Sequence, residues 1–324
     1  MKKGVITDYS WRKKRIILCI LIILFVLSIP TWIMMFYIFR HIKYMGVEDD
    51  RYPFQNVYKA EDFKISSTEL KLATSDDEYL WCAEVQADRP KGVIIYLAAM
   101  KEPSVTYFYG HAAMMKDKGY ASFLLEVRAH GQSSGKKLGM GYLEVEDVRT
   151  VVNFIKAQER YKDLPIILQG VSLGGSIAIN ATSQIPEVSG CIAMSPFASV
   201  DDQLDIILKK YHIPGFLRAA QRPFTHQALR MFYGKDNADN VTPIESIQHL
   251  NNKPVLVIAA KEDESISVEN SYRLQNVAEN AEFWFRESSD HYVIEDNNFK
   301  FVTQDKEYCN YVISFINKIA DTKQ

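Results

Sequence analysis

Cysteine is scarce in this chain of 324 residues, which has only four. Cys19 lies inside a long apolar run, so three cysteines remain for the rest of the chain: Cys82, Cys191 and Cys309. An odd number without regular spacing argues against the disulfide framework of small secreted domains. No spacing resembles a zinc site, so we expect no metal. Cys191 lies in the apolar stretch GCIAM, which predicts a packed thiol.

A surplus of basic charge, internal repeats and low-complexity tracts are also missing. The formal net charge is −2, and six of the 38 basic residues lie in the first fifteen positions beside one acid. The rest of the chain therefore has 32 basic and 39 acidic residues, and this acidic body argues against a nucleic-acid partner. With 47% hydrophobic residues, the chain can form one sizeable domain or two small ones.

One long run, Ile16 to Phe39, has no charged residue. As a helix it would be about 36 Å long, enough to cross a hydrocarbon core of about 30 Å. Pro30 would kink the helix, which is tolerated in membranes. A cleaved signal peptide is the alternative, but it would have a shorter apolar region and a small-residue cleavage site, which is missing. We therefore predict a basic tail over residues 1–15 and an uncleaved transmembrane helix over residues 16–39.

Charges flank this run unequally. The basic tail precedes it, whereas Arg40 and Lys43 follow it and are themselves followed by three acids at 48–50. The positive-inside rule predicts a single-pass membrane protein with a cytoplasmic N-terminus and an extracytoplasmic catalytic domain. Residues 40–65 are polar and aromatic without a clear period, which is typical of a linker.

From residue 66 to 324 the pattern predicts one domain of the α/β class. Two strand patterns, LKLATS and LWCAEVQA, come first. Short buried apolar runs such as GVIIYLAA then alternate with amphipathic segments such as residues 142–160. Repeated strand–helix units imply a mostly parallel sheet with helices on both faces.

An insertion over approximately residues 198–250 breaks this alternation with helical patterns. It leaves the carboxyl end of one strand and returns to the next, and ligands bind at that edge of open parallel sheets. We therefore expect a small helical cap over the site. Packing against the sheet is the simplest explanation of its apolar residues, with an acyl-chain pocket or membrane contact as alternatives.

The pattern G-x-S-x-G occurs twice, around Ser172 in LQGVSLGGSIA and around Ser133 in HGQSSGK. Ser172 follows the strand pattern PIILQ and precedes a helix, whereas Ser133 is followed by a loop with further glycines. A sharp strand–turn–helix bend needs small flanking residues and exposes the serine hydroxyl at the sheet edge. The context therefore selects Ser172 as the nucleophile.

Several motifs in order resemble those of the α/β-hydrolases, similar to the serine aminopeptidase and monoacylglycerol-lipase-like branch in a membrane-anchored form. GVSLGG resembles the nucleophile elbow, and EVRAHGQSSG resembles the family's D-x-R-G-H-G-x-S-x-G loop, which accounts for the second serine match. SPFASVDD resembles the segment after the sixth strand. KPVLVIAAKEDESIS resembles the acid-bearing strand and turn, and ESSDHYV resembles the histidine turn. The resemblance covers roughly residues 66–319.

The order Ser…Asp…His of this fold falls on Ser172, Asp263 and His291. His291 would take the proton of the serine hydroxyl and return it to the leaving group, and Asp263 would orient the imidazole. Leu173 N–H would be the first oxyanion donor. The family usually has His-Gly in the turn that supplies the second donor, where this chain has Ala98-Ala99-Met100. Because the donor belongs to the backbone, we expect Met100 N–H to serve.

These residues predict a serine hydrolase that cleaves a carboxylic ester through an acyl-Ser172 intermediate, without metal or cofactor. A small acyl compound would be the substrate, and the membrane would be contacted through the N-terminal helix. A serine aminopeptidase, amidase or thioesterase is one alternative, for which Glu102 near the oxyanion turn could receive a substrate amino group. A degenerate, membrane-tethered binding protein is the other, supported only by the missing His-Gly.

Overall fold

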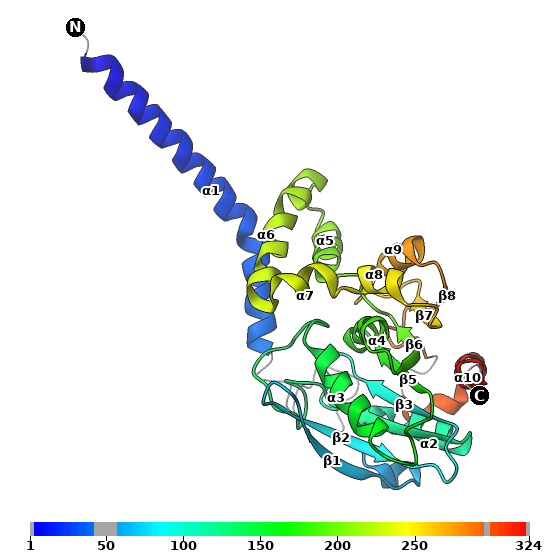
Figure 1. The fold of residues 1–324 in the computed structure, drawn as a ribbon. Helices are drawn as coiled ribbons and strands as arrows, with labels where there is room; N and C mark the ends of the chain where they lie inside the picture. The colour runs from blue at the N-terminus through cyan, green and yellow to red at the C-terminus, as the bar shows by residue number, and fades with distance from the viewer. Residues whose placement is uncertain (1–2, 42–56, 101, 295–298, 322–324) are drawn as a thin grey trace.

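The computed structural model describes residues 3–41, 57–100, 102–294 and 299–321. Its first element is the long helix α1 (Lys3–His41), which projects from the body of the molecule (Figure 1). Most of the predicted linker, residues 42–56, lies outside the described residues. The rest of that segment carries the short 3-10 helix η2 (Ala60–Phe63) and is joined to the body by a bond from Tyr58 N–H to Thr106 Oγ1 (3.0 Å).

Eight strands form a single sheet in the order β1-β2-β4-β3-β5-β6-β7-β8. β2 pairs antiparallel with both β1 and β4, and every other pair is parallel. This sheet confirms the predicted fold class. The strands are β1 (Thr68–Ala73), β2 (Tyr79–Val85), β3 (Gly92–Leu97), β4 (Tyr120–Leu125), β5 (Ile166–Val171), β6 (Val188–Met194), β7 (Val255–Ala260) and β8 (Ala281–Arg286).

Helices cover both faces of the sheet (Figure 1). Successive residues of a strand point to opposite faces of the sheet. Ile95 and Ile94 accordingly belong to two separate clusters of buried side chains, one on each face. One cluster includes α3 (Glu144–Lys156), α4 (Leu173–Gln184) and α9 (Glu269–Val277), and the other includes α2 (Tyr109–Asp117) and α10 (Lys306–Asp321). The central strands are fully buried because both faces are covered. The 3-10 helices η3 (Val105–Phe108) and η5 (Phe299–Gln304) precede α2 and α10.

The segment between β6 and β7 is helical, and we call it the cap. It consists of α5 (Val200–Lys210), α6 (Gly215–Tyr233), α7 (Lys235–Asn240), α8 (Pro243–Ser246) and the 3-10 helix η4 (Ile247–His249). α5 begins at Ser199, whose hydroxyl accepts a hydrogen bond from Asp202 N–H (3.0 Å). α6 lies against the C-terminal half of α1 (Figure 1).

Candidate active site

Ser172, Asp263 and His291 all follow carboxyl ends of neighbouring parallel strands. Ser172 follows β5, Asp263 comes three residues after β7, and His291 comes five residues after β8. Backbone hydrogen bonds continue the sheet at this edge, from Ser172 N–H to Met194 O (2.8 Å) and from Ser195 N–H to Ile258 O (2.7 Å). Since neighbouring strands are about 4.8 Å apart, β5 and β7 are about 10 Å apart, with β6 between them. Loop side chains can bridge that separation.

Ser172 occupies a strained bend between β5 and α4. Its φ of 56° and ψ of −118° are rare for a residue with a side chain. The chain passes itself closely here, because a Cβ atom on Gly170 would lie 2.3 Å from the carbonyl of Gly174. A Cβ atom on Gly175 would lie 2.9 Å from Met194 O. The two glycines thus allow the turn that brings Ser172 to the edge of the sheet, where it is half-buried.

Asp263 and His291 form a hydrogen-bonded pair. His291 Nδ1 lies 2.7 Å from Asp263 Oδ2, and the side chain of Asp263 is 1% exposed. The other oxygen of Asp263 accepts bonds from the N–H groups of Ser265 (2.7 Å) and Ile266 (2.9 Å). A carboxylate held in this way keeps the proton of a neutral imidazole on Nδ1 and leaves Nε2 as a base. The neighbouring acids Glu262 and Glu264 are both exposed.

The structure brings two of the three predicted catalytic side chains into contact, but not the third. Among the described residues, no hydrogen bond joins the Ser172 hydroxyl to the His291 ring. The Ser172 hydroxyl donates to no other group in those ranges either. Catalytic hydrogen bonds are often formed only once substrate is bound, so this geometry alone does not remove a candidate base.

The two predicted oxyanion donors belong to backbone segments that touch. A Cβ atom on Gly174, the residue after Leu173, would lie 2.2 Å from Leu97 O and 2.7 Å from Ala98 O. The start of α4 therefore lies against the turn that carries Met100. Within the described chain, neither Leu173 N–H nor Met100 N–H takes part in a backbone hydrogen bond. As the first residue of its helix, Leu173 also has no acceptor inside α4.

Two side chains that the sequence did not assign to this turn hold it in place. The Ala99 N–H donates to the hydroxyl of Tyr107 (2.9 Å), and His130 Nε2 lies 2.9 Å from Met100 O. The Nδ1 atom of the same ring lies 3.2 Å from Arg128 O. Burial lowers the pKa of His130, against the opposing effect of these two carbonyl groups, and Met100 O is the nearer of the two. No local sequence signal marks Tyr107, because the bond depends on the fold of η3.

Glu102 links the turn at residues 98–100 to the loop that carries His291. It is 1% exposed, and Tyr292, the residue after His291, donates its hydroxyl proton to Glu102 Oε1. The Tyr292 ring also packs edge-to-face with Tyr107, at 6.3 Å between centroids. Burial raises the pKa of Glu102 to about 7. These buried contacts hold the turn at residues 98–100 and the loop that carries His291 at a fixed separation.

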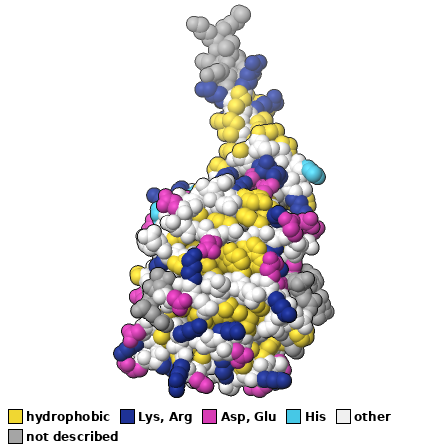
Figure 2. All heavy atoms as spheres, turned by 90° about the vertical axis from the view of Figure 1, so that its right-hand side faces the viewer, with side chains coloured by type: hydrophobic (Ala, Val, Ile, Leu, Met, Phe, Trp, Pro, Cys, Tyr) yellow, Lys and Arg dark blue, Asp and Glu magenta, His cyan; other side chains and the backbone are white. Residues whose placement is uncertain are grey.

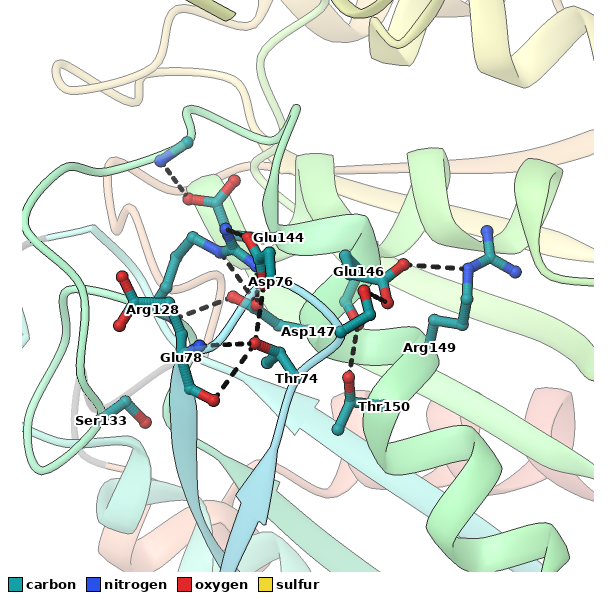
Figure 3. Close-up of polar contacts among 12 residues, drawn as sticks. Thr74, Asp76, Glu78, Arg128, Ser133, Glu144, Glu146, Asp147, Arg149 and Thr150 are labelled. Atoms are coloured by element: carbon teal, nitrogen blue, oxygen red, sulfur yellow. Dashed lines mark hydrogen bonds and ion pairs between the residues drawn. The ribbon is translucent and has the colours of Figure 1, made fainter.

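The second G-x-S-x-G match lies in a braced loop. The Ser133 hydroxyl accepts a bond from Trp81 N–H (2.8 Å) and donates to Glu126 O (2.5 Å). Beside it, Arg128 donates to both Asp147 (2.6 Å) and Asp76 (2.7 Å), as Figure 3 shows. Both functions of the Ser133 hydroxyl are thus used within the fold, which gives it a structural role.

No group of three or more histidine, cysteine or acidic side chains among the described residues could hold a metal ion. The thiols of Cys82, Cys191 and Cys309 are buried and free. Burial raises the pKa of Cys309 to about 11 and that of Cys191 to about 12. Cys191 is therefore a packed thiol, as its apolar surroundings in the sequence predict.

Part of the chain is similar in sequence to known proteins. The family described as "Serine aminopeptidase, S33" matches residues 88–220. An uncharacterized Bacillus subtilis protein, YqkD, is 30% identical over 58% of this chain and 60% of its own. A monoglyceride lipase of Mus musculus is 27% identical over 43% of this chain and 46% of its own. The chain thus spans about half of the length of the curated relatives it matches.

Solved structures show the same fold. An esterase of Pyrococcus furiosus superposes with a TM-score of 0.62 at 20% identity, over 81% of this chain and 96% of its own. The single sheet with helices on both faces agrees with this similarity of fold. The chain therefore has the α/β-hydrolase fold, and over less than half of its length its sequence is similar to that of a monoglyceride lipase.

Proposed function

We propose that the chain is a serine hydrolase that cleaves a carboxylic ester through an acyl-Ser172 intermediate. The observation that carries the proposal is the Asp263–His291 pair, formed at the sheet edge where Ser172 occupies its strained bend. Matches to a family of serine aminopeptidases and to a monoglyceride lipase support hydrolysis as the reaction.

His291 Nε2 would accept the Ser172 proton as the hydroxyl oxygen attacks the ester carbonyl. Asp263 would stabilise the imidazolium that forms, because its carboxylate is 2.7 Å from Nδ1. Leu173 N–H and Met100 N–H would bind the negative oxygen of the tetrahedral intermediate, where one donor is worth about 2.7–4 kcal/mol. The imidazolium would then protonate the leaving alcohol, and water would release the acid by the same steps.

We further propose that α1 anchors the enzyme in a membrane as a single-pass helix. Among the described residues, one helix is long and apolar enough to cross a bilayer, over Trp11–Phe36. Basic residues before the apolar run favour a cytoplasmic N-terminus, with the hydrolase domain on the opposite side. In this arrangement the domain acts at the surface of the membrane.

An ester and amide panel tests the reaction. The full-length protein in detergent should hydrolyse p-nitrophenyl esters, and His291→Gln should lower kcat by about 10⁴-fold or more, since the base is lost. Faster turnover of amino-acid p-nitroanilides than of esters would favour an aminopeptidase, the alternative that the family's description suggests. No turnover of either class by the wild-type protein would support a degenerate binding protein.

A further inference from the structure

Helix α1 has two parts that differ in their surroundings. Residues 11–26 are exposed on every side, whereas one face of residues 27–36 is covered. Thr31 and Met35 are each only 2% exposed, while Trp32 and Ile33 between them are 55% and 63% exposed. Positions four apart lie on the same face of a helix, so a neighbouring element packs on that face.

The neighbouring element is α6 of the cap. Gln221 Nε2 donates to Thr31 Oγ1 (2.7 Å), which lies 3.0 Å from Thr225 Oγ1, and Gln221 also donates to Thr225. All three side chains are buried. We call these three residues the helix clamp. Hydrogen bonds between side chains fix one helix against another at a definite height, which apolar packing alone does less strictly.

The turn between α5 and α6 and the first residues of α6 expose large apolar side chains. We call residues 211–217 the cap tip. Among the described residues, Tyr211 and Phe216 are each 73% exposed, and Ile213 and Leu217 are each 37% exposed. Figure 1 shows the start of α6 rising from the body on the side from which α1 projects. Clustered, exposed aromatic and aliphatic side chains of this kind mark an interaction surface.

Residues 16–26 of α1, which no other described element covers, are too short to cross a bilayer alone, and this indicates a lipid surface as the partner of the cap tip. Residues 16–26 are all apolar, and eleven residues in a helix span only about 16 Å. A hydrocarbon core is about 30 Å thick. A bilayer crossed by α1 must therefore extend along residues 27–36, to the height at which α6 packs on the helix. Figure 2 shows the basic side chains near the far end of α1, beyond its apolar stretch.

The helix clamp then fixes the position of the cap tip along α1, and with it the depth of the tip relative to the membrane. Gln221 contacts α1 at Thr31, inside the apolar span. Phe216 lies five residues closer to the start of α6, up to about 7 Å further along it toward the membrane interior. Lys209 and Lys210, just before the tip, are exposed and form ion pairs with Glu269 (2.5 Å) and Glu264 (4.0 Å), so the apolar side chains carry the proposed contact.

We infer that the cap tip inserts into the same bilayer that α1 spans, so that the cap is a second membrane contact of the enzyme. The inference rests on the proposed anchoring of α1 and on no step of the proposed reaction. The partner is a lipid surface, recognised by the aromatic and aliphatic side chains of the tip in its interfacial region.

Spin labels on the full-length protein in phosphatidylcholine nanodiscs test this inference. One label is placed on native Cys19, which is exposed in the apolar span. The others are placed at Phe216→Cys or Met231→Cys, each combined with Cys19→Ser. Phe216 and Met231 are matched, because they lie on the same helix and are 73% and 72% exposed. Cys19→Ser alone controls for labelling of the buried thiols.

We expect labels at residues 19 and 216 to collide readily with dissolved oxygen and to be shielded from a water-soluble nickel chelate. The label at residue 231 should show the opposite preference. Nickel accessibility at residue 216 equal to that at residue 231, with residue 19 in lipid, would overturn the inference and leave the anchor intact. A label at residue 19 in water would overturn both.

Discussion

Ser172 and Ser133 match the same sequence pattern but differ in what surrounds their hydroxyl groups. The Ser133 hydroxyl accepts a bond from Trp81 N–H and donates its proton to Glu126 O, so it is held in place by the fold. Ser172 has a φ of 56° at a strand–helix junction, with the Asp263–His291 pair on the same edge of the sheet. The elements around the two serines, rather than the shared motif, therefore favour Ser172 as the proposed nucleophile.

The largest expected contrast is between Ser172→Ala and Ser133→Ala. The first should lower kcat for a p-nitrophenyl ester by about 10⁴–10⁶-fold, as in other triad hydrolases. The second should leave kcat within a few-fold and lower the free energy of unfolding by about 1–3 kcal/mol, because buried hydrogen-bonding groups lose their partner. Steady-state kinetics and urea unfolding measure the two effects. Similar losses of kcat in both variants would contradict the assignment of Ser172 as the nucleophile and of Ser133 as a structural residue.

Asp263 and Glu262 offer a second contrast, between two adjacent acids. Asp263→Asn should lower kcat by about 10⁴-fold, because the amide favours the wrong tautomer of His291. Glu262→Gln should retain wild-type kcat, since Glu262 is exposed. The same ester assay compares them, and a large loss in the Glu262 variant would reassign the acid.

The glycines of the Ser172 bend should tolerate substitution poorly. In Gly174→Ala, the new Cβ atom would lie 2.2 Å from Leu97 O, a backbone atom of a buried strand that cannot shift cheaply. We expect a loss of about 1–3 kcal/mol in the free energy of unfolding. Gly215→Ala is the control, because its Cβ atom would meet nothing closer than 3.7 Å. Equal stability of the two variants in urea unfolding would refute the packing argument.

His130→Ala tests the support of the oxyanion turn. Loss of the bond to Met100 O, worth about 1 kcal/mol, should lower kcat roughly five-fold and leave KM nearly unchanged. The bond would position the proposed donor Met100 N–H, which would act on the transition state, and kcat should therefore respond. His249→Ala, at an exposed position, serves as the control. A change confined to KM would place His130 in substrate binding instead.

The smallest expected effect is a pH dependence of stability that arises from Glu126, beside Ser133. Burial raises the pKa of Glu126 to about 7, above its ordinary value of about 4.5. The folded state therefore binds this proton more tightly than the unfolded state does, and stability from this group falls as pH rises from about 4.5 through 7. The melting temperature of Glu126→Gln should decline less between pH 5 and pH 8, by a few °C. Exposed Glu187→Gln should keep the wild-type slope.

Much of the fold follows from local patterns in the sequence. Short apolar runs predict the buried strands. Glycines between a strand pattern and a helix pattern predict the bend at Ser172. The choice of Ser172 over Ser133 also came from local context. The resemblance of KPVLVIAAKEDESIS to the acid-bearing turn indicates Asp263, and its burial beside two exposed glutamates agrees with that assignment.

Contacts between distant segments could not be predicted. Tyr107, Tyr292 and Glu102 brace the turn and the histidine loop only because η3 and the segment after β8 meet in the fold. The bond between Thr31 and Gln221 joins residues 190 positions apart. An apolar run indicates a membrane helix, but its composition does not reveal that a single face of it packs on the cap.

The residue that a fluorophosphonate modifies identifies the nucleophile. The full-length protein is treated with the probe and digested, and the labelled peptide is sequenced by mass spectrometry. The account predicts one adduct, on Ser172, and none on Ser133. An adduct on Ser133, or continued labelling of the Ser172→Ala variant at any other serine, would contradict it.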